Sequence, residues 1–255
     1  IMACVNLNEE VVIKNAAMEP EIVDLCNFLS LTGVTFKGIG THTLTVIGLK
    51  NSNNVNLSYS IIPDRIEAGT FMIASAAVGG KVKFNNINPS HLSSVIECLE
   101  KTGSMIKFNK NSLTIISNGN ITAHSIKTDV YPGFPTDLQA QWIALMCKSD
   151  GKSTVEDTIY LDRFTHVPEL NRLGANISMN NNIATIKGVK NLYGTDVMST
   201  DIRASASLII AGMISEGVTN LSRIYHIDRG YEKIEEKLVS LNVDIKRVKW
   251  MPLLK

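Results

Sequence analysis

The chain has 255 residues, 44% of them hydrophobic and 19% charged, and its 25 basic and 24 acidic side chains leave a net charge of +1. This composition excludes a disordered chain, and the length allows one large or two modest domains. The near-neutral charge argues against a nucleic-acid-binding or polybasic membrane surface, and no apolar run approaches the ~18 residues that span a bilayer. We therefore expect a cytoplasmic protein that has no nucleic acid and no membrane as partner.

The four cysteines, at positions 4, 26, 98 and 147, contain no C-x-x-C pair and have no histidine nearby at metal-ligand spacing. This pattern indicates neither a disulfide framework nor a zinc site, and it favours a reducing compartment. We expect no metal site, and we expect the cysteines on apolar helix faces to be inert.

In chain order, the predicted elements repeat four times. A helix-like segment ends and a β-like run follows at positions spaced by 70, 71 and 66 residues, namely Glu10, Gly80, Gly151 and Gly217. A second amphipathic helix ends at positions spaced by 70, 71 and 68 residues, before the strand-like runs VTF, SMIKF, ANISM and VDIKR, namely at Gly33, Gly103, Gly174 and Asn242. Each unit of about 70 residues is predicted to run helix, strand, helix, strand, strand, and several such units are expected to share a helical core.

The second unit shows the pattern most clearly. Residues 67–80 carry small and apolar side chains at helical spacing and end at two glycines, and residues 81–87 alternate as a half-buried strand. Residues 89–103 form a second helix with an apolar stripe, and residues 104–117 form a hairpin that turns at Asn-Lys-Asn. Before this unit, residues 61–69 are predicted to form a crossover between domains that carries Asp64, Arg65 and Glu67.

Arginine is scarce, with seven residues against 18 lysines, and four of the seven follow an aspartate by one or two positions. Asp137 is expected at a helix N-terminus, Thr200 or Asp201 at an N-cap with Arg203 in the first turn, and Arg229 just before a helix. An N-cap aspartate has a purely structural explanation. A cation in a first helical turn opposes the helix dipole unless an anion is bound beside it. Several arginines at helix starts therefore predict a pocket for a carboxylate or phosphate.

Seven strings in the chain resemble, in order and spacing, the UDP-N-acetylglucosamine enolpyruvyl transferases (UDP-N-acetylglucosamine 1-carboxyvinyltransferases): EPEIVDL, IPDRIEAGTF, YPGFPTDLQAQ, RFTHVPEL, LYGTDV, STDIRASA and RIYHIDRGYE. The resemblance implies an inside-out α/β barrel built from six βαβαββ units. Four units are recognised here, so we expect the C-terminal part of such a protein, lacking roughly the first third. Residues 1–62 would be the last unit of an otherwise missing first domain, and residues 63–255 a second domain of three units.

The resemblance also implies an activity: transfer of the enolpyruvyl group of phosphoenolpyruvate to the 3-hydroxyl of UDP-N-acetylglucosamine, the first committed step of peptidoglycan synthesis, without metal or other cofactor. Asp137 would bind the sugar 3-hydroxyl and act as general base, and the backbone of Ile159 would contact UDP-N-acetylglucosamine, although the Ile159 side chain alone suggests ordinary strand core. The phosphoenolpyruvate would be held by Arg163, Arg203 and Arg229.

A further group of residues is expected to support the site. Asp201 matches a family carboxylate near the same centre, and a hinge or interdomain role is expected for Asp64, Arg65 and Glu67. The family's catalytic loop cysteine has no counterpart among the four cysteines, so we expect no turnover from the 255 residues alone. Two alternatives remain open: a truncated or decayed module without activity, and a related enolpyruvyl transferase that uses another acceptor.

Overall fold

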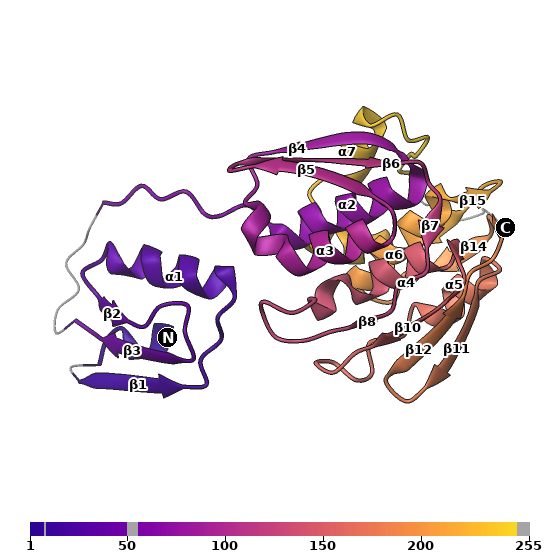
Figure 1. The fold of residues 1–255 in the computed structure, drawn as a ribbon. Helices are drawn as coiled ribbons and strands as arrows, with labels where there is room; N and C mark the ends of the chain where they lie inside the picture. The colour runs from indigo at the N-terminus through magenta and orange to yellow at the C-terminus, as the bar shows by residue number, and fades with distance from the viewer. Residues whose placement is uncertain (8, 50–55, 249–255) are drawn as a thin grey trace, which may run out of the picture.

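The computed structural model describes residues 1–7, 9–49 and 56–248. Figure 1 shows a smaller body near the N-terminus and a larger one that contains the rest of the chain, with residues 56–64 running in extended form into the larger body. The elements follow the predicted four-fold repeat, described unit by unit below.

The first unit holds a short 3₁₀ helix, one α-helix and an antiparallel sheet in the order β1-β3-β2. Its elements are η1 Met2–Cys4, β1 Glu10–Lys14, α1 Pro20–Ser30, β2 Thr35–Lys37 and β3 Thr43–Ile47. Buried residues of α1 and of the sheet form a hydrophobic cluster separate from those of the larger body: Ala16, Cys26, Val34, Leu44 and Val46. This separation agrees with a domain boundary near residue 62, which remains a prediction.

The second unit repeats the same sheet order, β4-β6-β5. Its elements are α2 Arg65–Val78, β4 Gly80–Asn85, η2 Pro89–Leu92, α3 Ser93–Lys101, β5 Met105–Asn109 and β6 Ser112–Ser117. The hairpin predicted between residues 104 and 117 is confirmed. Its turn is fixed by the side chain of Asn109, which accepts hydrogen bonds from the backbone N–H groups of Asn111 and Ser112 at 3.1 and 3.0 Å.

The third unit places β10-β12-β11 in the same order and adds β8 as a parallel neighbour of β10. Its elements are β7 Ile121–Thr122, β8 Ile126–Lys127, η3 Thr136–Leu138, α4 Gln139–Met146, β9 Ser149–Asp150, β10 Lys152–Glu156, α5 Val167–Arg172, β11 Asn176–Asn180 and β12 Ile183–Lys187. The parallel pairs β7–β9 and β8–β10 enclose α4, so each forms a β-α-β connection.

The fourth unit has two such parallel pairs, β13–β15 and β14–β16, around α6. Its elements are β13 Leu192–Tyr193, β14 Asp196–Met198, α6 Ile202–Met213, β15 Ser215–Glu216, β16 Asn220–Ser222, η4 Ile224–Arg229 and α7 Ile234–Ser240. The predicted strand VDIKR is wrong, because residues 243–248 form no strand. Val243 and Ile245 instead pack against the buried residues of α7.

The second helix of each unit ends in the same backbone conformation. Two or three residues beyond the last helical residue, the chain takes a positive φ of 99°, 98°, 93° and 65° in the four units, at Gly33, Gly103, Gly174 and Asn242. Glycine and, less readily, asparagine adopt this left-handed conformation, which ends a helix and turns the chain. The repeat predicted from spacing is therefore also a repeat of backbone geometry.

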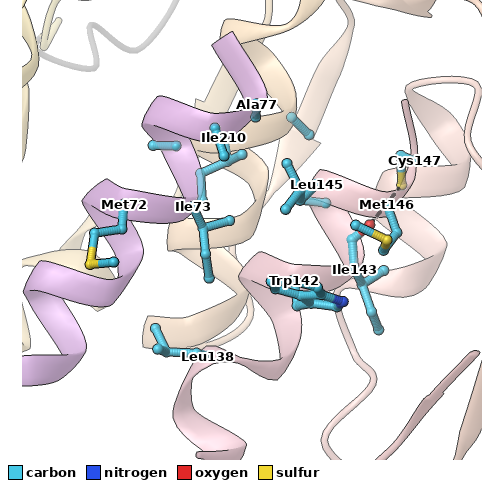
Figure 2. Close-up of a cluster of buried hydrophobic side chains, with 14 of the residues drawn as sticks. Met72, Ile73, Ala77, Leu138, Trp142, Ile143, Leu145, Met146, Cys147 and Ile210 are labelled. Carbon is cyan, nitrogen blue, oxygen red and sulfur yellow. Dashed lines mark hydrogen bonds between the residues drawn. The ribbon is translucent and has the colours of Figure 1, made fainter. Parts of the chain in front are cut away.

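Three helices, α2, α4 and α6, lie at the centre of the larger body and the antiparallel sheets lie outside them (Figure 1). Helix α4 is apolar on nearly all sides, and every one of its residues is buried. Figure 2 shows Ile73 of α2 and Ile210 of α6 directed toward Leu145 of α4. Helices inside and sheets outside are what the predicted inside-out α/β fold requires, and that prediction is confirmed.

Three of the cysteines fit the expected inert role. Cys26 and Cys147 are fully buried, and burial raises the pKa of the Cys147 thiol to about 12 and that of Cys98 to about 11. Neither of these two thiols carries the thiolate that nucleophilic chemistry needs at neutral pH. Among the described helices, none has the length and hydropathy needed to cross a bilayer.

Candidate active site

The carboxylate of Asp137 lies between two arginines. It occupies the 3₁₀ turn η3, which leads directly into α4 after Pro135, as the sequence predicted. Arg163 Nη1 donates to Asp137 Oδ1 at 2.6 Å, and Arg203 Nη2 lies 3.2 Å from Asp137 Oδ2. Two guanidinium groups from distant parts of the chain therefore converge at one carboxylate. Such a concentration of guanidinium groups is what a site for anionic ligands requires.

The pKa of Asp137 reflects this environment. Burial of the side chain raises it, but the guanidinium groups of Arg203 and Arg163 more than offset burial, and the pKa lies below its usual range. The pKa of Arg203 shifts in the opposite direction. Burial lowers it, but Asp137 and, to a lesser extent, Tyr231 raise it, and the net pKa is raised. Without an anionic ligand, Asp137 is thus an ionised but weakly basic carboxylate.

A second aspartate, Asp157, organises the loop that carries Ile159 and Arg163. It is fully buried at the end of β10, and Oδ1 accepts from Thr128 Oγ1 and from the backbone N–H groups of Ile159 and Tyr160 at 2.8, 3.0 and 2.9 Å. Its Oδ2 accepts from Thr136 Oγ1 at 2.7 Å. Asp157 therefore ties the residue before Asp137 to the loop that approaches it.

Ile159 differs from the sequence-based interpretation of its side chain. Strand β10 ends at Glu156, and the Ile159 side chain is 44% exposed rather than part of a strand core. The motif TVEDTIY continues an alternating pattern past the strand's end, where the buried Asp157 carboxylate turns the backbone away. An exposed residue at this point suits the expected contact with a sugar nucleotide, which remains a prediction.

Asp201 caps α6, as predicted from Thr-Asp-Ile-Arg. Its Oδ1 accepts from the backbone N–H groups of Arg203 and Ala204 at 2.8 and 2.9 Å, and Thr165 Oγ1 donates to Oδ2 at 3.0 Å. Burial raises the pKa of Asp201, but these hydrogen bonds outweigh it and the net pKa is lowered. The cap fixes the backbone of Arg203 in the first turn of α6, so Asp201 supports the pair at Asp137 indirectly.

Arg229 is not part of the Asp137 cluster in the structure. It is exposed in the last turn of η4, and α7 begins only at Ile234, so the prediction of an arginine at a helix start is wrong here. Within residues 1–7, 9–49 and 56–248, no hydrogen bond or ion pair of Arg229 is found. Its neighbour Asp228 pairs with Arg247 at 2.7 Å.

The crossover residues connect elements. Asp64 caps α2, accepting from the backbone N–H groups of Ile66 and Glu67 at 2.8 and 3.0 Å. Arg65 Nε donates to Glu21 Oε1 of α1 at 2.8 Å, and Glu67 Oε1 accepts from Lys237 Nζ of α7 at 2.6 Å. Arg65 thus joins the first unit to the second, which supports the predicted interdomain role of this group without testing it.

Sequence reasoning missed three buried polar residues behind the site. Gln141 Nε2 donates to the backbone oxygen of Asp137 at 3.0 Å and to Thr70 Oγ1 at 3.0 Å, and it lies 3.3 Å from the hydroxyl of Tyr231. Arg203 Nη1 lies 3.4 Å from the same hydroxyl. A signal was present, since each residue lies inside one of the seven strings, and polar side chains at such apolar positions indicate a specific partner.

No group of three or more His, Cys, Asp or Glu side chains in the described ranges has a metal-binding arrangement. The site offers guanidinium groups and one carboxylate instead, which are ligands for anions and hydroxyl groups.

The fold is of the enolpyruvyl-transferase type, and comparison with known proteins agrees. A family model described as EPSP synthase (3-phosphoshikimate 1-carboxyvinyltransferase) matches residues 1–238, so the chain belongs to this family. Within it, the chain is 48% identical over 249 residues to a UDP-N-acetylglucosamine 1-carboxyvinyltransferase of Geobacter metallireducens, covering 98% of this chain and 59% of that protein. It is 47% identical over 249 residues to the enzyme of that name from Orientia tsutsugamushi, covering 97% of this chain and 59% of that protein.

These relatives confirm the resemblance stated from the sequence, and the chain spans 59% of the length of each of them. Two solved structures share the fold at low sequence identity. The enolpyruvyl transferase NikO from Streptomyces tendae has a TM-score of 0.85 at 22% identity, over 95% of this chain and 57% of that chain. EPSP synthase from Acinetobacter baumannii has a TM-score of 0.59 at 14% identity, over 74% and 44%.

Proposed function

We propose that the complete protein is a UDP-N-acetylglucosamine 1-carboxyvinyltransferase and that this chain supplies its general base and part of its phosphoenolpyruvate site. The observation that carries the proposal is the placement of Arg163 and Arg203 at 2.6 and 3.2 Å from the two oxygens of Asp137. The name shared by relatives at 45–49% identity supports the choice of sugar acceptor.

The chemistry assigns different roles to these groups. The 3-oxygen of the sugar forms a bond to C2 of phosphoenolpyruvate, Asp137 accepts the hydroxyl proton, and an acid supplied by the rest of the complete protein would donate a proton to C3. Return of a C3 proton to a basic group of the site and cleavage of the bond between C2 and the phosphate oxygen then give the enolpyruvyl ether and inorganic phosphate. Arg163 and Arg203 would hold the carboxylate and phosphate, whose charge is redistributed as the tetrahedral adduct forms and collapses.

The remaining predicted contacts complete the proposed site. The backbone at Ile159, in the turn fixed by Asp157, would contact UDP-N-acetylglucosamine. Arg229 would join the phosphoenolpyruvate site from the end of η4, where the next residue, Gly230, packs closely against Ile202 beside Arg203. The reaction requires neither metal nor other cofactor, and we place it in the cytoplasm, at the first committed step of peptidoglycan synthesis, with no nucleic acid or membrane as partner.

The test is phosphate release from phosphoenolpyruvate by the product of the complete coding sequence. UDP-N-acetylglucosamine is expected to support turnover and 3-phosphoshikimate is not. Asp137→Asn removes the proton acceptor and is expected to lower kcat by ~10²–10⁴-fold. Asp150→Asn serves as the matched control, because Asp150 is exposed on β9. The turnover of this variant should equal that of the wild type.

Other results would favour the alternatives. Turnover with 3-phosphoshikimate or a different acceptor alone would replace the acceptor in the proposal, and a complete product without turnover would favour a non-catalytic module. The 255 residues by themselves span 59% of the length of the relatives, and we expect no turnover from them.

A further inference from the structure

A buried polar network lies behind Asp137 and Arg203, formed by side chains far apart in the sequence. Thr70 lies on α2, Gln141 on α4 and Tyr231 between η4 and α7, and their exposed fractions are 3%, 0% and 1%. The Thr70 and Tyr231 hydroxyl groups are 2.8 Å apart, and Gln141 Nε2 reaches both. Buried polar groups of this kind cost stability unless they are paired, so their pairing restricts their geometry.

The orientation of the Gln141 amide follows from its partners. The backbone oxygen of Asp137 is only an acceptor, so the group 3.0 Å from it must be the Gln141 NH₂. The one remaining hydrogen of that NH₂ faces the oxygens of Thr70 and Tyr231. Gln141 thus connects the backbone of the proposed general base to the hydroxyl of Tyr231.

The hydroxyl group of Tyr231 is the shared point of this network. Arg203 Nη1 lies 3.4 Å and Gln141 Nε2 lies 3.3 Å from its oxygen, and both of these nitrogens can only donate. The hydroxyl groups of Thr70 and Tyr231 are hydrogen-bonded to each other at 2.8 Å, and either oxygen can be the donor. Tyr231 therefore accepts from Arg203 while Thr70 and Gln141 hold its hydroxyl group in place.

We infer that Tyr231 is a positioning residue for the proposed reaction: its hydroxyl, fixed by Thr70 and Gln141, holds the Arg203 guanidinium in the orientation that faces Asp137. Arg203 has two ends, with Nη1 on Tyr231 and Nη2 on Asp137, at 3.4 and 3.2 Å. Because the guanidinium group is planar and rigid, fixing one nitrogen fixes the direction of the other. Only the catalytic consequence of this inference rests on the proposed function, because the contacts of Arg203 with Tyr231 and Asp137 lie within this chain.

The first test therefore uses the 255-residue chain and no activity. Tyr231→Phe removes the acceptor for Arg203 and keeps the ring. The charged groups that face Asp137 are Arg163 and Arg203, so a less ordered Arg203 weakens the stabilisation of the Asp137 carboxylate. Titration of the Asp137 carboxyl by carbon NMR should show its pKa rising by about half a unit in the variant. Tyr193→Phe removes an exposed hydroxyl on β13 and should leave the titration unchanged.

A second pair of variants guards against a variant that fails to fold. Thr70→Val removes the hydroxyl group that bonds Tyr231 with almost no change of shape, and Thr70→Ser keeps that hydroxyl group. Thr70→Val should raise the pKa of Asp137, as Tyr231→Phe does. Thr70→Ser should keep the pKa of Asp137 at its wild-type value. A network that only supports packing would lower the melting temperature in both Tyr231→Phe and Thr70→Val without moving the Asp137 titration, and that result would overturn the inference.

The complete protein provides the second readout. If the proposed function holds, Tyr231→Phe should raise the KM for phosphoenolpyruvate by about 3- to 10-fold, corresponding to the loss of one ordinary hydrogen bond, and change the KM for the sugar nucleotide much less. Equal changes in both KM values would contradict selective positioning of Arg203. A shifted Asp137 titration in a complete protein without turnover would leave the inference intact and reject the proposed function.

Discussion

At the residue scale, the short contacts of Asp137 present a chemical problem for a general base. Its carboxylate is neutralised by Arg163 and Arg203, which hold its pKa below the usual range, and a weaker base accepts a proton less readily. A dianionic substrate held by the same two arginines would compete with Asp137 for them. Binding of phosphoenolpyruvate is therefore expected to make Asp137 more basic at the moment the acceptor hydroxyl is needed.

This expectation can be measured on the 255-residue chain. Saturating phosphoenolpyruvate should raise the pKa of the Asp137 carboxyl, measured by carbon NMR, above its value in the free chain. In the free chain, the lowered pKa of Asp137 also makes folding stability depend on pH. The stabilisation from ionised Asp137 is fully present above the pKa that Asp137 has in the unfolded chain, and it is lost as the pH falls through the lower pKa of Asp137 in the folded chain. Bound phosphoenolpyruvate without any change at Asp137 would show that the arginines serve both anions at once.

The site residues divide into those that local sequence can place and those that it cannot. The N-cap of Asp201 and the position of Arg203 in the first turn follow from Thr-Asp-Ile-Arg, because capping depends on residues two and three positions away. The pairing of Asp137 with Arg163 and Arg203 joins residues 26 and 66 positions apart, and no local rule selects those partners. The family strings indicated the residue types, and only the fold shows that Asp137 pairs with Arg163 and Arg203 while Arg229 makes no ion pair within the described residues.

At the element scale, the contact between α2 and η3 helps to position Asp137. Gly69 lies in α2 where an added Cβ would overlap Leu138 Cδ1, and Leu138 is the residue after Asp137 and is fully buried. Alanine is intrinsically better than glycine in a helix by roughly 1 kcal/mol. Overpacking against a side chain that is already enclosed costs typically about 1–3 kcal/mol, and here it should outweigh the propensity gain.

Gly69→Ala is therefore expected to lower the free energy of unfolding, measured by urea denaturation of the 255-residue chain, and to disturb the Asp137 resonance. Gly212→Ala in α6 is the matched control, since its Cβ would lie 3.3 Å from the Thr219 side chain and needs a shift of only a few tenths of an ångström. A stabilised Gly69→Ala chain would show that Leu138 moves aside freely and that α2 does not constrain η3.

The elements themselves were largely accessible from the sequence, because the repeat supplies four versions of one pattern. A unit that is ambiguous alone, such as the fourth, could be aligned to the second through the turn residues Gly103 and Asn242, which share a positive φ. The same alignment failed at VDIKR, where the repeat predicted a strand. No described strand is available there as a hairpin partner, and Val243 and Ile245 contribute to the core beside α7 as irregular chain.

At the scale of the whole molecule, the hydrophobic core is divided. The cluster of the first unit shares no residue with the two clusters of residues 66–245. The ion pair of Arg65 with Glu21 joins the two bodies, whereas the hydrogen bond of the Tyr59 hydroxyl to Asp24, at 2.7 Å, lies within residues 1–62. A partly exposed ion pair contributes about 0–1 kcal/mol, which is small beside the burial of either core.

Residues 1–62 and 63–255 are therefore expected to unfold as two units, which calorimetry of the 255-residue chain would record as two transitions. Leu44→Ala and Leu145→Ala each remove a buried leucine, from the first-unit cluster and from α4, at a cost of about 2–5 kcal/mol. Each substitution should lower one transition and leave the other in place. If both variants lowered one common transition, the bodies would be coupled more strongly than the ion pair of Arg65 with Glu21 explains, and the domain boundary predicted at residue 62 would not be a boundary of cooperative folding.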